Sequence, residues 1–119
     1  YSQRLQDGTR AALATPDKTT GRQGFDRVSQ GGAQATGRAS GQIAEGQWAD
    51  LMALDTASEH LWGRSADQIL DAWIFASDDR LVQDVWAAGR HMVRDGLHIH
   101  RPRIVAAYKK TLDALRDAI

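Results

Sequence analysis

Histidines are the residues of this chain whose spacing could do chemistry. His98 and His100 are two residues apart, and on a strand such a pair points to one side, where both rings could bind a divalent metal. A complete site needs further ligands and ordered neighbouring groups, and His60, His91 and the carboxylates have no recognisable spacing to the pair. We therefore weigh a metal site against a polar loop before the last helix, and the loop is the favoured interpretation.

Two other groups of residues resemble parts of known sites. Asp78 and Asp79 form a carboxylate pair, but their sequence context is typical of a turn rather than of acid–base chemistry. Gly31, Gly32 and Gly37 follow no predicted strand and precede no Lys-Ser or Lys-Thr, so they do not form a phosphate-binding loop. No Ser–His–Asp arrangement follows from the spacing, and we assign no catalytic residue.

The tryptophans could form a stacking surface of the kind that single-strand nucleic-acid binders use. Such binders combine aromatic side chains with a basic groove, and no basic groove accompanies the tryptophans in this sequence. We therefore expect Trp48, Trp73 and Trp86 to serve in core or interface packing.

Length and composition limit the function further. The chain has 119 residues with 15 Lys and Arg against 15 Asp and Glu, so we expect one modest domain with no nucleic-acid or anionic membrane partner. No stretch approaches the roughly 18 to 20 apolar residues of a membrane span, and no cysteine is present for disulfides or thiolate metal sites. We expect a soluble, cytoplasmic protein. The start at Tyr1 without Met fits a piece of a longer protein, and trimming of a tag or disorder of the preceding residues would look the same.

A small sheet is predicted to organise the chain. Residues 41–55 form a loop punctuated by glycines that leads into a short apolar strand at 51–54. Residues 82–87 alternate as a half-exposed strand does, residues 88–90 break the pattern, and 91–96 read as the returning strand. With the helices that flank this sheet, described next, the predicted fold class is α+β.

Helices flank this sheet. Residues 1–14 predict an amphipathic helix weakened by Gly8, and residues 22–37 predict a second helix with a narrow face of small side chains. We expect a helical turn at 65–70, capped by Ser65, and then a strand at 72–76. A terminal helix begins near Pro102. Its apolar face consists of Ile104, Val105, Tyr108, Leu112, Leu115 and Ile119.

Two motifs resemble a known family. Residues 41–55, GQIAEGQWADLMALD, are similar to the signature that closes metal-dependent amidohydrolases of the cytosine-deaminase and chlorohydrolase type, and residues 85–96, VWAAGRHMVRDG, resemble the hairpin that follows it. Within that superfamily the formimidoylglutamate deiminases are the most similar. The segments that suggest them are residues 1–5, 31–37, 73–76, read as a strand, and 96–98, read as a turn.

The resemblance implies a fold and an activity. Residues 1–40 would be the last helices of a (β/α)8 barrel, 41–98 part of a small composite β-sandwich, and 99–119 a C-terminal helix. The parent enzyme would use zinc to hydrolyse N-formimidoyl-L-glutamate to N-formyl-L-glutamate and ammonia in histidine degradation. The family's metal ligands would all precede Tyr1, and His98-Ile99-His100 does not correspond to the family's His-x-His. We therefore carry over no catalytic, cofactor-binding or metal residue, and expect this piece alone to be inactive and without zinc.

Other interpretations stay open at this point. The parent could be another deaminase or chlorohydrolase of the superfamily, or the chain could be a stand-alone structural or interaction module. As a piece, it would pair with the missing N-terminal part of the same protein. Unpaired strand edges and apolar side chains such as Trp73, Phe75 and Trp86 would lie uncovered, so we also expect a homo-oligomer, with strand or helix exchange.

Overall fold

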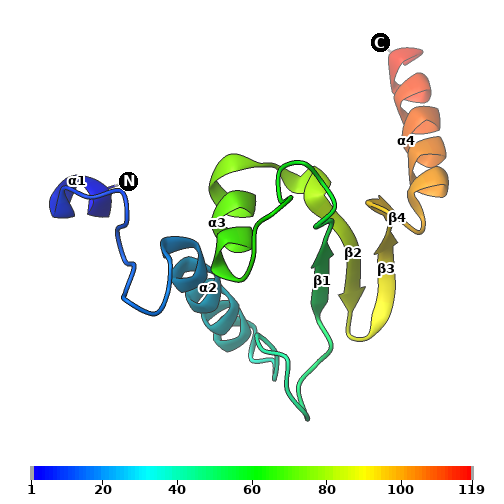
Figure 1. The fold of residues 1–119 in the computed structure, drawn as a ribbon. Coiled ribbons are helices and arrows are strands. Elements are labelled where there is room, and N and C mark those ends of the chain that lie inside the picture. Colours follow the sequence, from blue (N-terminus) through cyan, green and yellow to red (C-terminus); the bar gives the residue numbers. More distant parts are fainter. Residues whose placement is uncertain (1, 119) are drawn as a thin grey trace.

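The computed structural model describes residues 2–118, without the side chain of Gln3, as a mixed fold of helices and one antiparallel sheet (Figure 1). Along the chain, α-helices come before the first strand, between the first two strands and after the last strand. In chain order the elements are α1 (Ser2–Asp7), α2 (Thr20–Thr36), β1 (Leu51–Leu54), α3 (Asp67–Ala76), the 3-10 turn η1 (Asp79–Leu81), β2 (Val82–Ala87), β3 (Arg90–Arg94), β4 (Leu97–His98) and α4 (Arg101–Arg116).

The sheet has the order β1-β2-β3-β4, with each strand antiparallel to its neighbours. Ala88 and Gly89 turn the chain between β2 and β3, and Asp95 and Gly96 turn it between β3 and β4; all four have positive φ, as two-residue hairpin turns require. The strands predicted at 51–54, 82–87 and 91–96 are confirmed within a residue or two. The turn expected at 96–98 is wrong, because Leu97–His98 forms a fourth strand.

The first two helices follow their local signals. α2 begins after Thr19, whose hydroxyl accepts a hydrogen bond from the Arg22 amide, and ends at Gly37 in the left-handed conformation. α1 is shorter than the predicted helix at 1–14, because Gly8 adopts φ +63° and the chain leaves the helix there. Tyr1, the first residue of that prediction, lies outside the described residues.

α3 corrects the prediction for residues 65–76. The segment is one helix, Asp67–Ala76, and neither the strand at 72–76 nor a side-chain cap from Ser65 is present. Ile69, Ala72 and Trp73 lie at helical spacing and pack with the cluster around Leu61. A short apolar run is ambiguous in sequence, and here burial of this one helix face decides it.

The core is small. Leu61 is 1% exposed and packs with buried Ala72 and Leu81, while Leu54, Ile69 and Trp73 are partly buried around them. The ring of Phe25 on α2 meets the ring of Trp73 edge to face, with the centroids 6.3 Å apart. The hydrophobic core therefore lies where α3 and the 56–66 loop meet the start of β2 and the end of β1.

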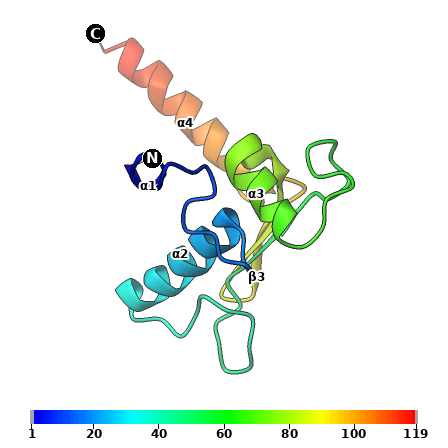
Figure 2. The ribbon, with the colours of Figure 1, turned by 60° about the vertical axis from the view of Figure 1, so that its left-hand side comes forward.

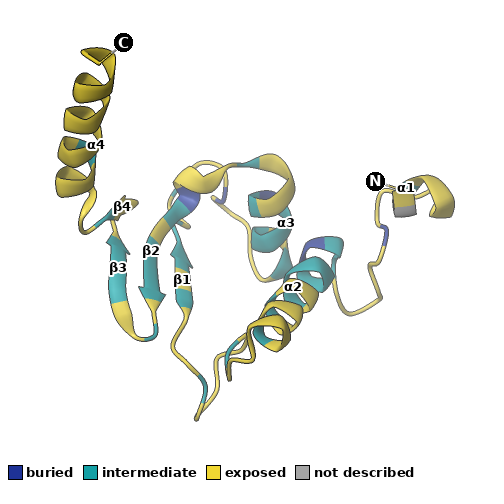
Figure 3. Cartoon of the chain, turned by 180° about the vertical axis from the view of Figure 1, so that it is seen from behind, coloured by how far each residue is buried: buried dark blue, intermediate teal, exposed yellow. Residues whose placement is uncertain are grey.

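The molecule is extended rather than spherical. Its radius of gyration is 18.7 Å, whereas a compact chain of this length has about 13.5 Å. Its accessible surface is 9286 Å², compared with about 6,400 Å² for a compact monomer of this mass. Figures 1 and 2 show α1 and α4 standing off from the centre, and Figure 3 shows strands of intermediate burial. The chain therefore carries about 2,900 Å² more exposed surface than a self-contained globule would.

α4 confirms the predicted terminal helix. Pro102 lies in its first turn, as expected, and no residue of the helix is buried. Ile119, the last residue of the predicted apolar face, lies outside the described residues. Among the described residues, no helix has the length and apolarity needed to cross a membrane.

Candidate functional site

The histidine pair does not form a metal centre with other groups. His98 ends β4 and His100 precedes α4, with ring centroids 5.6 Å apart and the rings tilted by 60°. The His100 amide donates a hydrogen bond to His98 Nδ1 over 3.1 Å, so this ring nitrogen already has a partner. Across residues 2–118, no three His, Asp or Glu side chains gather closely enough to hold a metal ion. The described residues therefore do not fit the zinc site that the family implies, and no catalytic step is assigned to them.

His91 belongs to a different contact. Its Nε2 lies 2.6 Å from Asp84 Oδ1, and its ring stacks on Trp86 with centroids 4.5 Å apart. These three side chains share one face of the β2–β3 hairpin, since His91 lies opposite Trp86 in the register. The contact ties the two strands together and explains Trp86 as a packing residue.

Asp78 acts in a turn, as predicted. Its carboxylate accepts a hydrogen bond from the Arg80 amide at the start of η1 and forms an ion pair with the Arg80 guanidinium over 2.6 Å. The hydrogen bond from Arg80 lowers the pKa of Asp78 below its usual value. The carboxylate is therefore held in its charged form by a local partner.

The tryptophans divide between the core and the surface. Trp73 packs in the core, whereas Trp48 is 51% exposed with the Arg38 guanidinium 4.8 Å from its ring centroid. Trp62, which lies on the 56–66 loop, is 75% exposed. The prediction of core or interface packing is confirmed for Trp73 in the core, and Trp86 packs against His91. Trp48, for which the same prediction was made, lies on the surface of this chain, as does Trp62, for which none was made.

The two motifs that resemble the amidohydrolases meet in space. The Asp50 carboxylate accepts a hydrogen bond from the Ala88 amide over 2.8 Å, and the Ala49 carbonyl accepts one from the Gly89 amide over 2.9 Å. Gly41 has φ +86° and lies so close to α2 that an added Cβ would be 2.6 Å from the Ser29 carbonyl oxygen. The first motif therefore links α2 to the β2–β3 turn. Gly41 permits the close approach to α2, and the Asp50 carboxylate binds the turn at Ala88.

The most connected polar cluster joins α2 to α3, and we name it the α2 clasp: Thr19, Gly21, Arg22, Asp67 and Asp71. Asp71 Oδ1 accepts a hydrogen bond from the Gly21 amide over 2.7 Å, and Asp67 Oδ1 accepts one from Arg22 Nε over 2.8 Å. Carboxylates at a helix N-terminus satisfy free amides and oppose the positive end of the helix dipole. α3 thus supplies the anions that hold the first turn of α2.

Further charges surround the α2 clasp. Lys18 Nζ lies 2.7 Å from Asp26 Oδ2, and Asp26 Oδ1 lies 3.6 Å from Arg22. A pocket of about 520 Å³ opens beside these groups. Its wall combines three cations, Arg4, Arg10 and Lys18, with three carboxylates, Asp17, Asp67 and Asp71, so its charges balance. Asp67 and Asp71 already bond to α2. We assign the cluster to folding rather than to ligand binding.

Sequence reasoning did not find the α2 clasp. Asp67 and Asp71 are four residues apart and therefore share a helix face, a signal that becomes visible once 67–76 is read as one helix. Placing a strand at 72–76 hid this spacing. Their target, the buried Gly21, has no sequence signal of its own, because its role depends on the approach of another element.

The α2 clasp predicts a pH effect that Asp67→Asn reveals. The hydrogen bond from Arg22 lowers the pKa of Asp67, and the Thr19 amide adds to the effect. A carboxylate whose pKa is lower in the folded state than its unfolded value of about 3.9 stabilises the fold at pH values above about 3.9. This stabilisation is lost as the pH falls through the folded-state pKa. We therefore expect a lower melting temperature than wild type for Asp67→Asn at pH 7, and a difference that shrinks below about pH 4.

Thermal melts at pH values from 7 to 3 measure this difference. Asp17→Asn is the control, since Asp17 is exposed and lies outside the α2 clasp, and it should follow the wild-type curve. A difference between Asp67→Asn and wild type that stays constant across the acid range would contradict the prediction.

The chain is similar to known proteins along nearly its whole length. No protein-family model matches it. It is 42% identical over 118 residues to formimidoylglutamate deiminase of Pseudomonas aeruginosa, covering 98% of this chain and 26% of that protein. The crystal structure of an amidohydrolase from Brucella melitensis superposes with a TM-score of 0.76 at 39% identity, covering 97% of this chain and 25% of the other.

The chain thus spans about a quarter of the length of each of these relatives. The structural match includes nearly every described element, so the arrangement of helices and sheet recurs within a protein about four times as long. In sequence and in fold, the chain corresponds to a C-terminal fragment of an amidohydrolase, with formimidoylglutamate deiminase among its relatives.

Proposed function

We propose that this chain is the closing part of a metal-dependent iminohydrolase. The reaction is hydrolysis of the C=N bond of N-formimidoyl-L-glutamate, in which water enters and N-formyl-L-glutamate and ammonia leave, a step of histidine degradation. The observation that carries the proposal is 42% identity to a formimidoylglutamate deiminase along 98% of the chain. An identity that extends over nearly every element indicates a shared parent protein rather than a shared local motif.

Within that protein, we propose a supporting role for this part. The zinc ligands and catalytic groups belong to the preceding segment, and the chain alone is inactive. Residues 1–40 would supply the last barrel helices, 41–98 the sandwich sheet and 99–119 the closing helix. The α2 clasp crosses the boundary between the first two parts, since Gly21 and Arg22 bond to Asp71 and Asp67. Its N-terminal partner is the rest of the same cytoplasmic protein.

The direct test is expression of the complete reading frame that contains this chain. We expect ammonia release from N-formimidoyl-L-glutamate, loss of that activity after metal removal, and no activity from residues 1–119 alone. Cytosine and a chlorinated triazine serve as the competing substrates, because they represent the other branches of the superfamily. If the complete protein turns over either of these faster than N-formimidoyl-L-glutamate, the formimidoylglutamate deiminase assignment is wrong and the branch that uses that substrate replaces it. A reading frame whose start codon lies immediately before the codon of Tyr1 would favour the stand-alone module instead.

A chimera tests the supporting role separately. The last quarter of the Pseudomonas aeruginosa deiminase is replaced by residues 1–119, and we expect the chimera to keep at least a tenth of the parental kcat/KM. The control is the parental deiminase truncated at the same junction, which should lose activity. A chimera that folds with bound metal but has no more activity than the truncated control would contradict the proposal.

A further inference from the structure

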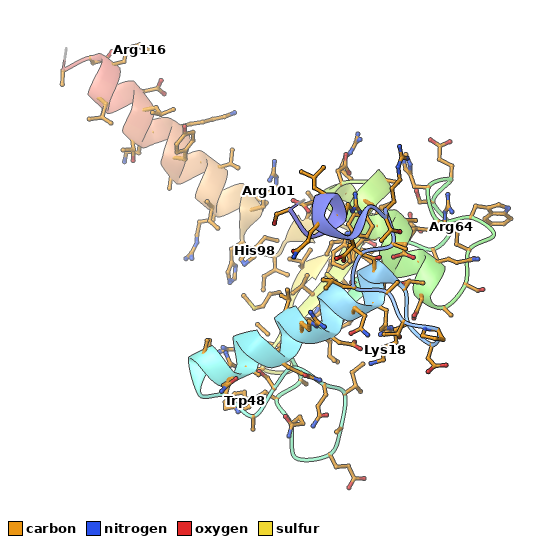
Figure 4. All side chains as sticks on the ribbon, turned by 90° about the vertical axis from the view of Figure 1, so that its left-hand side faces the viewer. Lys18, Trp48, Arg64, His98, Arg101 and Arg116 are labelled. Atoms are coloured by element: carbon orange, nitrogen blue, oxygen red, sulfur yellow. The ribbon has the colours of Figure 1, made fainter. Side chains whose placement is uncertain are left out.

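The loop between α2 and β1, residues 38–50, is held together by its own contacts. Arg38 Nη2 lies 3.2 Å from Asp50 Oδ2, and the Arg38 guanidinium lies 4.8 Å from the ring centroid of Trp48. The Trp48 amide also donates a hydrogen bond to the Ala39 carbonyl over 2.7 Å. Figure 4 shows Trp48 close to the end of α2 and the loop extending beyond it. The two ends of the 38–50 loop therefore lie together, as they do in a compact Ω-loop.

The 38–50 loop presents an uncovered aliphatic side chain. Ile43 is 90% exposed, the largest exposed fraction among the large apolar side chains of the residues that the structure describes. Two residues earlier, Gly41 lies so close to the Ser29 carbonyl of α2 that the backbone is fixed there. A side chain on a fixed loop loses little conformational entropy when a partner covers it. Ile43 is therefore well placed to anchor another part of the protein.

An apolar groove of about 510 Å³ opens beside Ile43, between α2 and the sheet. Among the described residues that line it, Asp50 alone is charged, and its carboxylate is already paired with Arg38 and with the Ala88 amide. Burying a charged ligand against apolar walls without a partner is unfavourable, so the groove suits apolar side chains. Its apolar lining consists of Phe25, Ile43, Leu51, Met52 and Trp86.

The relatives indicate what fills the groove. This chain corresponds to the C-terminal part of proteins of which it covers 26% and 25%, so about three quarters of the protein precede it. That part is covalently joined to the chain and has an effective concentration on the order of millimolar, which a second copy must supply in free solution. The chain also exposes about 2,900 Å² more surface than a compact monomer of its mass. The preceding part is therefore the occupant that the observations favour.

We propose that the 38–50 loop docks this chain onto the preceding three quarters of the protein. Ile43 is buried by that part, and apolar side chains of that part fill the groove between α2 and β1. This inference deepens the proposed function, because it names a surface through which the chain supports the larger protein. It rests on the position of the chain at the C-terminal end and does not depend on the reaction.

Cysteine labelling provides the first test. The chain has no cysteine, so Ile43→Cys introduces a single thiol. In the chain alone, this thiol should react with a maleimide about as fast as it does in urea. In the complete protein, the peptide that contains residue 43, followed by mass spectrometry, should react at least ten times more slowly than in urea. Glu45→Cys, on the same loop but outside the groove lining, is the matched control and should react rapidly in both.

The labelling rates also separate the possible occupants. Rapid labelling of residue 43 in the folded complete protein would overturn the proposal. Slow labelling in the chain alone would overturn it as well. If that slow rate depends on the concentration of the chain, a second copy covers the groove instead.

Melting temperatures provide a second test. Ile43→Ser should lower the melting temperature of the complete protein by at least about 3 °C, because a buried aliphatic side chain is lost. The same substitution should change that of the chain alone by less than about 1 °C, because residue 43 is exposed there. Glu45→Ser should leave both unchanged. An equal effect of Ile43→Ser in the two proteins would contradict the docking. Neither test measures activity, so failure of the proposed reaction leaves both results interpretable.

Discussion

Gly21→Ala is expected to destabilise the chain by about 2 to 3 kcal/mol, in the range for overpacking at a close contact together with a lost hydrogen bond to a charged group. A Cβ at this position would lie 2.5 Å from Asp71 Oδ1, 3.0 Å from the Asp71 backbone nitrogen and 3.1 Å from its Cα. The carboxylate could rotate away, but the backbone of α3 cannot move without separating from α2. The hydrogen bond from the Gly21 amide to Asp71 would be lost with that movement.

Gly24→Ala is the matched control for this substitution. Gly24 lies three residues further along the same helix, and an added Cβ there meets no atom within 4 Å. Because alanine has the higher helix propensity, the control should stabilise the chain by about 0.5 to 1 kcal/mol. Urea unfolding followed by tryptophan fluorescence measures both variants at one protein concentration. Similar shifts of the two midpoints would show that α2 and α3 do not approach each other as described.

Leu61→Ala is expected to cost about 3 kcal/mol, since truncating a buried leucine removes its transfer free energy and leaves a cavity. Leu61 is 1% exposed and stands at the centre of the cluster with Ala72 and Leu81. In a chain with so few buried side chains, this loss is a large share of the total free energy of unfolding. The variant should therefore be largely unfolded at a temperature where wild type is folded.

Leu5→Ala supplies the comparison at an exposed site. Leu5 lies on α1 and is 70% exposed, so its truncation should change the free energy of unfolding by less than about 0.5 kcal/mol. Calorimetry and near-ultraviolet circular dichroism report whether the packing around Trp73 survives in each variant. If both truncations have the same small effect, the core does not lie around Leu61.

Several elements were predictable because their signals are local. The strands at 51–54, 82–87 and 90–94 combine apolar runs with turn residues, and the structure gives each turn the positive φ that glycine permits. α2 and α4 carry their own boundary residues, Thr19 and Gly37 for the first and Pro102 for the second. The similarity to the amidohydrolases was also visible in two motifs, which the structure brings together at Asp50 and Ala88.

Other elements depended on contacts that no local pattern records. The start of α3 has a non-glycine residue, Ala66, at φ +47°, and no side chain caps this end, so its boundary is set by packing against Leu61. α1 ends earlier than its apolar spacing suggests, since Gly8 leaves the helix and little of the body covers Leu5.

The sequence by itself determined the strands of the hairpins, the two longer helices and the relation to a larger hydrolase, because each rests on residue types at short spacing. Tertiary structure alone decided that 67–76 is a helix, that its Asp67 and Asp71 hold the start of α2, and that α4 stands uncovered. These features depend on which surfaces approach each other and which stay exposed. The free energy of such a contact depends on two segments that are distant in the sequence, so the pattern of either segment alone does not predict it.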